Sequence, residues 1–121
     1  MEPFEITLPM PPSVNNSYGV RKGAFFKNKK YLAWDADCDE ILAKLPRPLP
    51  LFKNKVKLSY VYYFKKKGSD IDNRVKATTD FLVRAGFLIN DSFDHVLQYD
   101  IRFGGIDKYD PRVEIKIELI P

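Results

Sequence analysis

Two aspartates that stand between basic residues are the first place in this sequence where chemistry is expected. Asp70 and Asp72 lie in the stretch KKKGSDIDNRVK, residues 65–76, with lysines before them and Arg74 and Lys76 after them. Mg²⁺ prefers carboxylate and water oxygens and uses few protein ligands, which leaves room for a substrate phosphate. A site that grips a polyanion and holds a divalent metal on it is therefore one interpretation. A patch of structural salt bridges is another.

Further charged residues extend this pattern along a predicted helix. Asp72, Lys76 and Asp80 are spaced by four residues, so they line one edge of that helix. Lys76 would sit one turn beyond Asp72 and could neutralise charge that develops at a scissile phosphate. Asp91 follows the helix, in a turn. A helix of about 16 residues is about 24 Å long. Asp91 therefore meets Asp70 and Asp72 only if the chain doubles back or a second subunit supplies it.

A helix cap is an alternative explanation for the same acids. Ser69 and Asp72 have the spacing of a capping box, with Ser69 as the N-cap and Asp72 at the third helical position. Acids there stabilise a helix start by about 0.3–1 kcal/mol through the backbone dipole. The Asp72, Lys76 and Asp80 series could likewise form surface ion pairs worth about 0.3–0.5 kcal/mol each. The pattern alone leaves the cap and the metal site both open.

Basic residues cluster in two places, and aromatic residues accompany the first cluster. Residues 21–30 are rich in lysine and lie among Phe25, Phe26 and Tyr31. This mixture suits nucleic acid, with phosphates on the cations and bases or sugars near the rings, whereas a solvated loop is the alternative. The residues that we expect to contact DNA are Arg21, Lys22, Lys27, Lys29, Lys30, Lys65, Lys66, Lys67 and Arg74.

The composition predicts one ordinary folded domain that spans residues 1–121. Hydrophobic residues make up 45% and charged residues 30% of the 121 positions, which suits a packed core rather than disorder. A domain of this size buries only about two-thirds of the surface of its unfolded chain, so an oligomer would add burial. The formal net charge of +4 is modest. Its placement therefore matters more than its size.

Cysteine content and the N-terminus indicate the setting. Cys38 is the only cysteine, which excludes an intrachain disulfide and a cysteine zinc site and favours a reducing, intracellular environment. The N-terminus lacks the basic start and apolar run of a signal peptide. No stretch approaches the roughly 20 apolar residues that span a bilayer, so we expect no membrane contact.

Hydrophobic periodicity predicts an α+β fold with about four strands in one sheet, packed with two helices. The clearest strand signal is the alternation of Val113, Ile115, Ile117 and Leu119 with charged residues. Strands are expected over 3–9, 55–64, 96–103 and 112–119, helices over 31–45 and 70–85, a C-cap at Gly86, a loop or irregular hairpin over 13–30, and a turn over 104–111.

The block DIDNRVKATTDFLVRAGFLIND, residues 70–91, resembles the core of the RusA family of Holliday-junction resolvases. The opening ITLPMPPSVNN, a strand that runs into a proline-rich turn, is also similar to that family. The resemblance spans almost the whole chain in the same order. The positions that carry it are Asp70, Asp72, Asn73, Lys76, Asp80, Ala85, Gly86 and Asp91, with Ser13 and Asn15 in the opening.

This resemblance implies a homodimeric, Mg²⁺-dependent endonuclease of bacteria or their prophages, with Mn²⁺ able to substitute. It implies that the enzyme acts in DNA recombination and repair by cutting four-way DNA junctions with paired symmetric nicks. Carried over by position, it assigns metal binding to Asp70, Asp72 and Asp91, and it makes these acids and Lys76 catalytic. A cytoplasmic location and the absence of an organic cofactor are also implied.

The sequence departs from the family pattern at two positions near the acids. Asn90 stands where the family often has an acid, which predicts weaker metal binding, and Ser69 stands where a basic residue is frequent, which predicts altered DNA grip. His95, the only histidine, matches no family position. Two other functions stay open: a non-catalytic module that binds branched DNA or RNA, and a general structure-selective nuclease.

Overall fold

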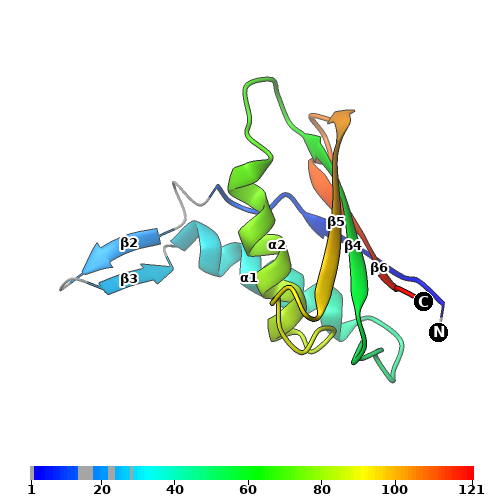
Figure 1. Cartoon of the computed structure of the whole chain (residues 1–121). Helices are drawn as coiled ribbons and strands as arrows, with labels where there is room; N and C mark the ends of the chain where they lie inside the picture. The colour runs from blue at the N-terminus through cyan, green and yellow to red at the C-terminus, as the bar shows by residue number, and fades with distance from the viewer. Residues whose placement is uncertain (1, 14–17, 22–23, 28) are drawn as a thin grey trace.

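The computed structural model describes residues 2–13, 18–21, 24–27 and 29–121, and it confirms an α+β fold (Figure 1). In chain order, the elements of the described residues are β1 (Phe4–Pro9), β2 (Tyr18–Arg21), β3 (Ala24–Lys27), α1 (Lys29–Ala43), β4 (Val56–Phe64), α2 (Asp72–Arg84), β5 (Val96–Ile106) and β6 (Arg112–Leu119).

One mixed sheet organises the molecule, with the strand order β1-β6-β4-β5. β6 lies antiparallel to both of its neighbours, whereas β4 and β5 run parallel. A second, two-stranded sheet pairs β2 with β3 in antiparallel fashion, so the hairpin expected within residues 13–30 is present among its described residues. The hairpin extends away from the main sheet (Figure 1). The main sheet therefore has two edges, β1 and β5.

Alternation of side chains along β4 decides which face of the main sheet is buried. Every second residue of β4 is buried and the residues between them are half-buried, which is the pattern of a strand with one covered face. Both helices pack on the covered face (Figure 1). The buried side chains of β4 are Val56, Leu58, Tyr60, Tyr62 and Phe64.

β5 is longer than the sequence predicted. It continues past Phe103 to Ile106, so the turn expected from residue 104 begins only after Ile106. Gly104 explains the extension, because a Cβ there would lie 2.6 Å from the ring of Tyr63 on β4. Glycine inside a strand permits this close approach instead of ending the strand. Leu97 was expected on the face of Tyr99, but the β4–β5 register shifts beside it, which breaks the simple alternation.

α1 runs from Lys29 to Ala43, two residues earlier at each end than the predicted helix. Its buried side chains include Trp34 and Cys38, as the predicted apolar face required. The Trp34 indole Nε1 donates a hydrogen bond of 2.9 Å to the carbonyl oxygen of Pro9 at the end of β1. This bond fixes α1 against the N-terminal strand. No helix of the described residues is long and apolar enough to cross a membrane.

α2 connects the parallel strands β4 and β5. The segment 65–71 leads from β4 into its first turn, and the segment 85–95 leads from its last turn to β5, so the two segments lie at opposite ends of α2 (Figure 1). The C-cap residue is Ala85, and Gly86, which the sequence predicted as the C-cap, follows it with φ of 88°. The amide of Gly86 donates to Val83 O at 3.1 Å and closes the end of the helix.

Two buried hydroxyl pairs hold α2 on the sheet. The hydroxyls of Tyr60 and Thr79 lie 2.7 Å apart, and those of Tyr62 and Thr78 lie 2.8 Å apart. Burial raises the pKa of both tyrosines, so the phenols stay neutral. Because a buried hydroxyl without a partner is costly, these pairs set the position of α2 along β4.

Candidate metal and nucleic-acid site

The segment between β4 and α2 presents the first two candidate acids to solvent. Residues 65–70 are all exposed, and Gly68 turns the chain with φ of 89°, a conformation that favours glycine. Asp70 accepts a hydrogen bond of 3.4 Å from the side-chain amide of Asn73. Asp72 is exposed and has neither a hydrogen bond nor an ion pair within the described part of the chain. Both carboxylates therefore remain accessible to a cation.

The capping box expected at this position is wrong. The N-cap of α2 is Ile71, and its φ of −69° and ψ of −43° already have the helical conformation. No side chain caps the helix, so Ser69 is not the N-cap and Asp72 is not the third helical residue. Asp72 still lies in the first turn, where the backbone N–H groups favour a negative charge. The capping box is therefore absent, whereas the favourable interaction of Asp72 with the helix dipole remains and is compatible with metal ligation.

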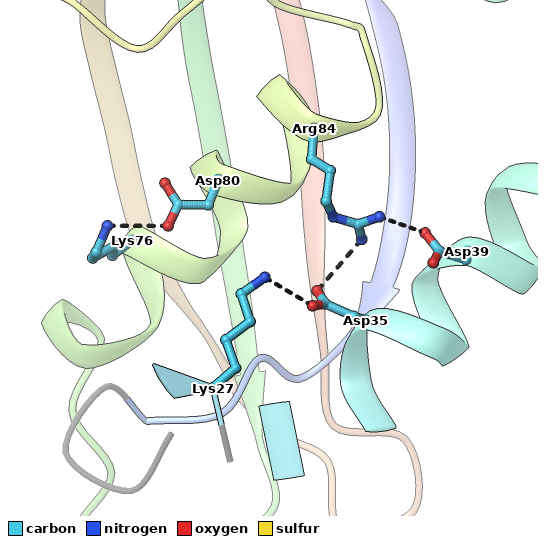
Figure 2. A network of polar contacts seen from close by, with 6 residues as sticks. All are labelled: Lys27, Asp35, Asp39, Lys76, Asp80 and Arg84. Atoms are coloured by element: carbon cyan, nitrogen blue, oxygen red, sulfur yellow. Dashed lines mark hydrogen bonds and ion pairs between the residues drawn. The ribbon is translucent and has the colours of Figure 1, made fainter. Parts of the chain in front are cut away.

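Lys76 lies one turn after Asp72 on α2, and its ammonium pairs with Asp80 at 3.1 Å (Figure 2). The Lys76 side chain is 62% exposed, so solvent screens this pair. Exposed ion pairs of this spacing contribute about 0.3–0.5 kcal/mol to stability. Lys76 can therefore exchange Asp80 for a phosphate oxygen at little cost.

Asp91 lies apart from the first two acids. It is exposed in the segment 85–95, beyond the C-terminal end of a helix whose 13 residues span about 20 Å. Burial raises the pKa of Tyr99 on β5, and the negative charges of Asp91 and Asp80 raise it further. Among the described residues of one chain, no three His, Cys, Asp or Glu side chains form a group that could hold a metal ion.

Arg74, one of the expected DNA contacts, points into the molecule. Its Nη1 donates a hydrogen bond of 2.7 Å to the carbonyl oxygen of Pro11, and its guanidinium lies 5.9 Å from the ring centre of Phe64. Burial lowers the pKa of Arg74. Its Nε is buried and has no partner among the described residues. This orientation favours a role in fixing the proline-rich turn to the start of α2 over the expected phosphate contact.

Lys27, another expected DNA contact, also has an internal partner. Its ammonium lies 2.9 Å from the carboxylate of Asp35 on α1 (Figure 2). The same ammonium lies 4.4 Å from the ring centre of Tyr31. Arg84 of α2 pairs with Asp35 and with Asp39, so this network joins β3, α1 and α2. The positive charge of Lys27 is thus largely offset by the protein.

The remaining expected DNA contacts are exposed where the structure describes them. Lys29 and Lys30 are exposed at the start of α1, and the lysines of the segment 65–70 are exposed beside Asp70. Lys22 and the side chain of Arg21 lie outside the described residues. Among the exposed cations that we expected to contact DNA, the lysines at positions 65, 66 and 67 lie closest in the chain to the two accessible acids.

An apolar groove adjoins these lysines, and the sequence reasoning missed it. Its volume is about 420 Å³, and its walls include Phe64, Phe103 and Ile106. Lys66 and Lys67 also line it. The alternation of β5 carried the only signal, because it placed Phe103 on the helix-covered face, but α2 leaves Phe103 57% exposed.

Comparison with known proteins identifies the family of this chain. Two accessible carboxylates beside a lysine cluster have the chemistry to hold a divalent metal and a phosphate. Residues 9–118 match the family model described as Endodeoxyribonuclease RusA, so the chain belongs to the RusA endodeoxyribonuclease family. It is therefore a DNA endonuclease, and the family supports a role in resolving Holliday junctions. A search of curated proteins found no match.

The donor set of this site suits the divalent metal that nucleases of this family generally need. Asp70 and Asp72 offer the hard carboxylate oxygens that Mg²⁺ selects, and no described cation neutralises them in an ion pair. Mg²⁺ commonly takes one or two carboxylates and completes its shell with water and substrate phosphate. The two acids therefore fit such an ion in type and in accessibility.

Proposed function

We propose that the protein is a homodimeric Holliday-junction resolvase that depends on Mg²⁺, with Mn²⁺ able to substitute, and that cuts by paired symmetric nicks. Asp70, Asp72 and Asp91 are the proposed metal ligands and catalytic acids, and Lys76 is the proposed catalytic lysine, which offsets charge on the phosphate. The observation that carries the proposal is the pair of accessible carboxylates at the start of α2, in a chain of this endonuclease family.

Each proposed residue has a separate task. Asp70 and Asp72 hold the cation against the scissile phosphate, and the bound cation supplies electrophilic assistance to phosphodiester hydrolysis. Lys76 leaves Asp80 and stabilises the negative charge that develops on the phosphate oxygens. Exposed lysines of the segment 65–70 hold the neighbouring backbone phosphates and fix the register of the strand.

A two-fold symmetric dimer suits a four-way junction. An isologous dimer presents two identical sites related by its axis, and a junction presents two equivalent strands related by its pseudo-symmetry. Paired nicks then follow from one binding event. We extend the proposal to a bacterial or phage origin and a cytoplasmic location, where recombining DNA is the substrate.

The substitution Asp72→Asn tests the metal role on a synthetic four-way junction. We expect cleavage in Mg²⁺ to fall at least about 100-fold, a loss of about 2.7 kcal/mol of transition-state stabilisation. Binding of the junction should persist, because lysines supply most of the affinity. Asp37→Asn is the matched control, since Asp37 is an exposed acid on α1. Cleavage by Asp72→Asn near the wild-type rate would remove Asp72 from the site.

Chelation separates an enzyme from a binding module. EDTA should abolish nicking by the wild-type protein, and excess Mg²⁺ should restore it, while the junction stays bound throughout. Binding without nicks in Mg²⁺ would instead support a non-catalytic protein. A competition experiment with linear, flap and junction substrates would show whether the enzyme selects the four-way junction.

A further inference from the structure

The apolar groove at the start of α2 lies directly beside the candidate acids. One of its walls is formed by the ends of β4 and β5, and the other by residues of the segment 65–71 that leads into α2. Ser69 and Ile71, the two chain neighbours of Asp70, both line it. A group that occupies this groove is therefore held next to the segment that carries Asp70.

Phe103 presents an aromatic surface inside the groove. Its ring stacks on the ring of Phe64, with the ring centres 6.2 Å apart and an angle of 24° between the ring planes. Phe64 is buried, whereas Phe103 is 57% exposed because α2 does not cover it. An exposed ring that packs against a buried ring is a firm platform on which a flat ring of a ligand can stack.

The size and the polar side chains of the groove suit a nucleotide. Its volume of about 420 Å³ lies within the range of about 300–1,000 Å³ that is usual for pockets that bind small molecules. Lys66 and Lys67 contribute two cations to the lining, and Ser69 contributes a hydroxyl that can both donate and accept a hydrogen bond. An aromatic platform beside cations is the arrangement that binds a base on the ring and a phosphate on the ammonium groups.

The two lysines favour DNA over a protein as the occupant of the groove. Lysine is depleted in the cores of protein interfaces, and a buried ammonium is costly unless an anion pairs with it. None of the described residues that line the groove is acidic. A DNA strand brings its own anions, so it can cover the apolar wall and neutralise both lysines together.

We propose that the groove is a subsite for one unstacked base of the DNA strand that the acids hold for cleavage. The base stacks on Phe103, its edge bonds to the hydroxyl of Ser69, and a neighbouring phosphate of the same strand lies on Lys66 or Lys67. The inference rests on the proposed function, because it names the part of the junction that this site selects.

A subsite for an unstacked base explains how the protein selects branched DNA. Inside a continuous duplex each base is paired and is stacked on both faces, so its removal from the stack is costly. At a branch point the stack is interrupted, and a base can leave it at a lower cost. A protein that gains affinity by filling this groove therefore favours the branch point over a linear duplex.

A double-mutant cycle between protein and DNA tests the subsite. Phe103→Ala removes the platform, and an abasic nucleotide, placed in turn at each position that adjoins the branch point, removes the base. Fluorescence anisotropy in EDTA measures junction affinity without cleavage. We expect Phe103→Ala to raise the dissociation constant at least about fivefold, and one abasic position to do the same. The two changes together should raise it no further than either change alone, because both remove the same contact.

Leu32→Ala is the matched control for Phe103→Ala. Leu32 is an apolar residue of α1 that is 55% exposed and does not line the groove. Its loss should leave the affinity for every junction unchanged, with or without the abasic nucleotide.

The identity of the base at the sensitive position tests Ser69. The wild type should bind junctions that differ only in this base with unequal affinity, because the hydroxyl bonds differently to each base edge. Ser69→Ala should narrow that range of affinities at least about threefold, the effect of one lost hydrogen bond. An unchanged range, or equal affinity of the wild type for all four bases, would show that Ser69 does not contact the base.

Three results would overturn the subsite. The first is that no abasic position weakens binding, and the second is that the effects of Phe103→Ala and the abasic nucleotide simply add. The third is a Phe103→Ala variant that dimerises more weakly in sedimentation velocity but binds the junction with unchanged affinity per dimer, which would place a second copy of the chain in the groove.

The abasic series changes no residue of the protein, so it decides the question even if Phe103→Ala fails to fold. Failure of the wild type to cut any junction in Mg²⁺ would remove the proposed function. The binding cycle in EDTA would still show whether the groove holds a base.

Discussion

At the scale of single residues, Arg74 shows how an expected DNA contact becomes a structural tie. Its guanidinium bonds the carbonyl of Pro11 and covers the ring of Phe64. Lysine keeps the charge but has neither the planar fork nor the flat face of arginine. We therefore expect Arg74→Lys to lower the free energy of unfolding by about 1–2 kcal/mol in urea titrations. Junction affinity should stay within about twofold of wild type, because the net charge is unchanged.

Lys66→Ala is the matched control for this prediction. Lys66 is exposed beside Asp70, so its loss should weaken junction binding and leave the unfolding free energy unchanged. The reverse result for Arg74→Lys, weaker binding at unchanged stability, would return Arg74 to the set of phosphate contacts.

The sequence predicted which acids are accessible but not where two of the cations point. Asp72 lies in the first turn of a helix, as the apolar stripe of α2 predicted, whereas Asp70 precedes the N-cap and lies outside the helix expected from residue 70. The direction of Arg74 depends on Pro11, which is 63 residues away in the chain. The partner of Lys27 depends on how the hairpin meets α1. Contacts of this kind depend on tertiary packing, which local sequence patterns do not predict.

At the scale of elements, the hydroxyl pairs between α2 and β4 determine how firmly the candidate site is held. Tyr62→Phe removes one hydroxyl of the Tyr62–Thr78 pair, and Thr78→Val removes the other without a change of shape. Thr78→Val should lose about 1–2 kcal/mol of unfolding free energy, because it leaves the buried hydroxyl of Tyr62 without its partner. Tyr62→Phe should lose less, because Thr78 still donates to Arg74 O. The double variant should lose less than the sum. Urea unfolding of all four proteins in a double-mutant cycle measures the coupling.

Purely additive losses would contradict this account. They would show that the two hydroxyls act independently and that apolar packing alone sets the position of α2. Thr78 also donates to Arg74 O at 2.9 Å, so the single Thr78→Val variant reports part of that bond as well.

Two glycines with positive φ stand in the segments on either side of α2. Gly68 and Gly86 have φ of 89° and 88°, and a Cβ at either would meet no atom within 4 Å. Alanine should therefore cost each position about 1–2 kcal/mol of stability, through backbone strain alone. Gly68→Ala should also weaken junction cleavage, because it redirects the segment that carries Asp70. Cleavage by this variant at the wild-type rate would show that the shape of the segment 65–70 does not matter.

The elements themselves could be predicted because their periodicity is local. Alternation identified β6 and β4, and the apolar stripe identified both helices to within two or three residues. Local periodicity could not predict the parallel pairing of β4 with β5, since this pairing depends on the crossover through α2. The length of β5 also escaped prediction. Glycine usually indicates a turn, but the absence of a side chain at Gly104 instead leaves room for the ring of Tyr63.

At the scale of the whole molecule, the helices and the candidate site occupy one side of the sheet. The other face of the sheet is open and lined by charged side chains of both signs, among them Lys57, Asp100 and Glu114. Ion pairs within this face, such as Arg112 with Glu114 at 3.1 Å, offset much of its charge. The exposed lysines before α2 and at the start of α1, by contrast, have no ion pair within the described part of the chain, so their charge is available to DNA.

This distribution of charge predicts that junction binding weakens steeply as the salt concentration rises. It also predicts how much of that dependence comes from the segment 65–67. Each phosphate neutralised by a lysine releases counterions, so the logarithm of the binding constant falls with the logarithm of salt concentration with a slope of about −0.9 per contact on duplex arms. Replacing Lys65, Lys66 and Lys67 together by alanine should reduce the magnitude of that slope by about 2–3 and weaken binding at low salt. Fluorescence anisotropy between about 50 mM and 200 mM salt, a range over which such contacts lose most of their affinity, measures both.

Lys27→Ala is the matched control. The ion pair of Lys27 with Asp35 withdraws the charge of Lys27 from DNA, so this substitution should leave the slope unchanged. The opposite result would be a slope whose magnitude falls with Lys27→Ala but not with the triple variant. That result would place the DNA against the hairpin rather than at the start of α2. The strand that Asp70 and Asp72 are proposed to cut would then lie there too.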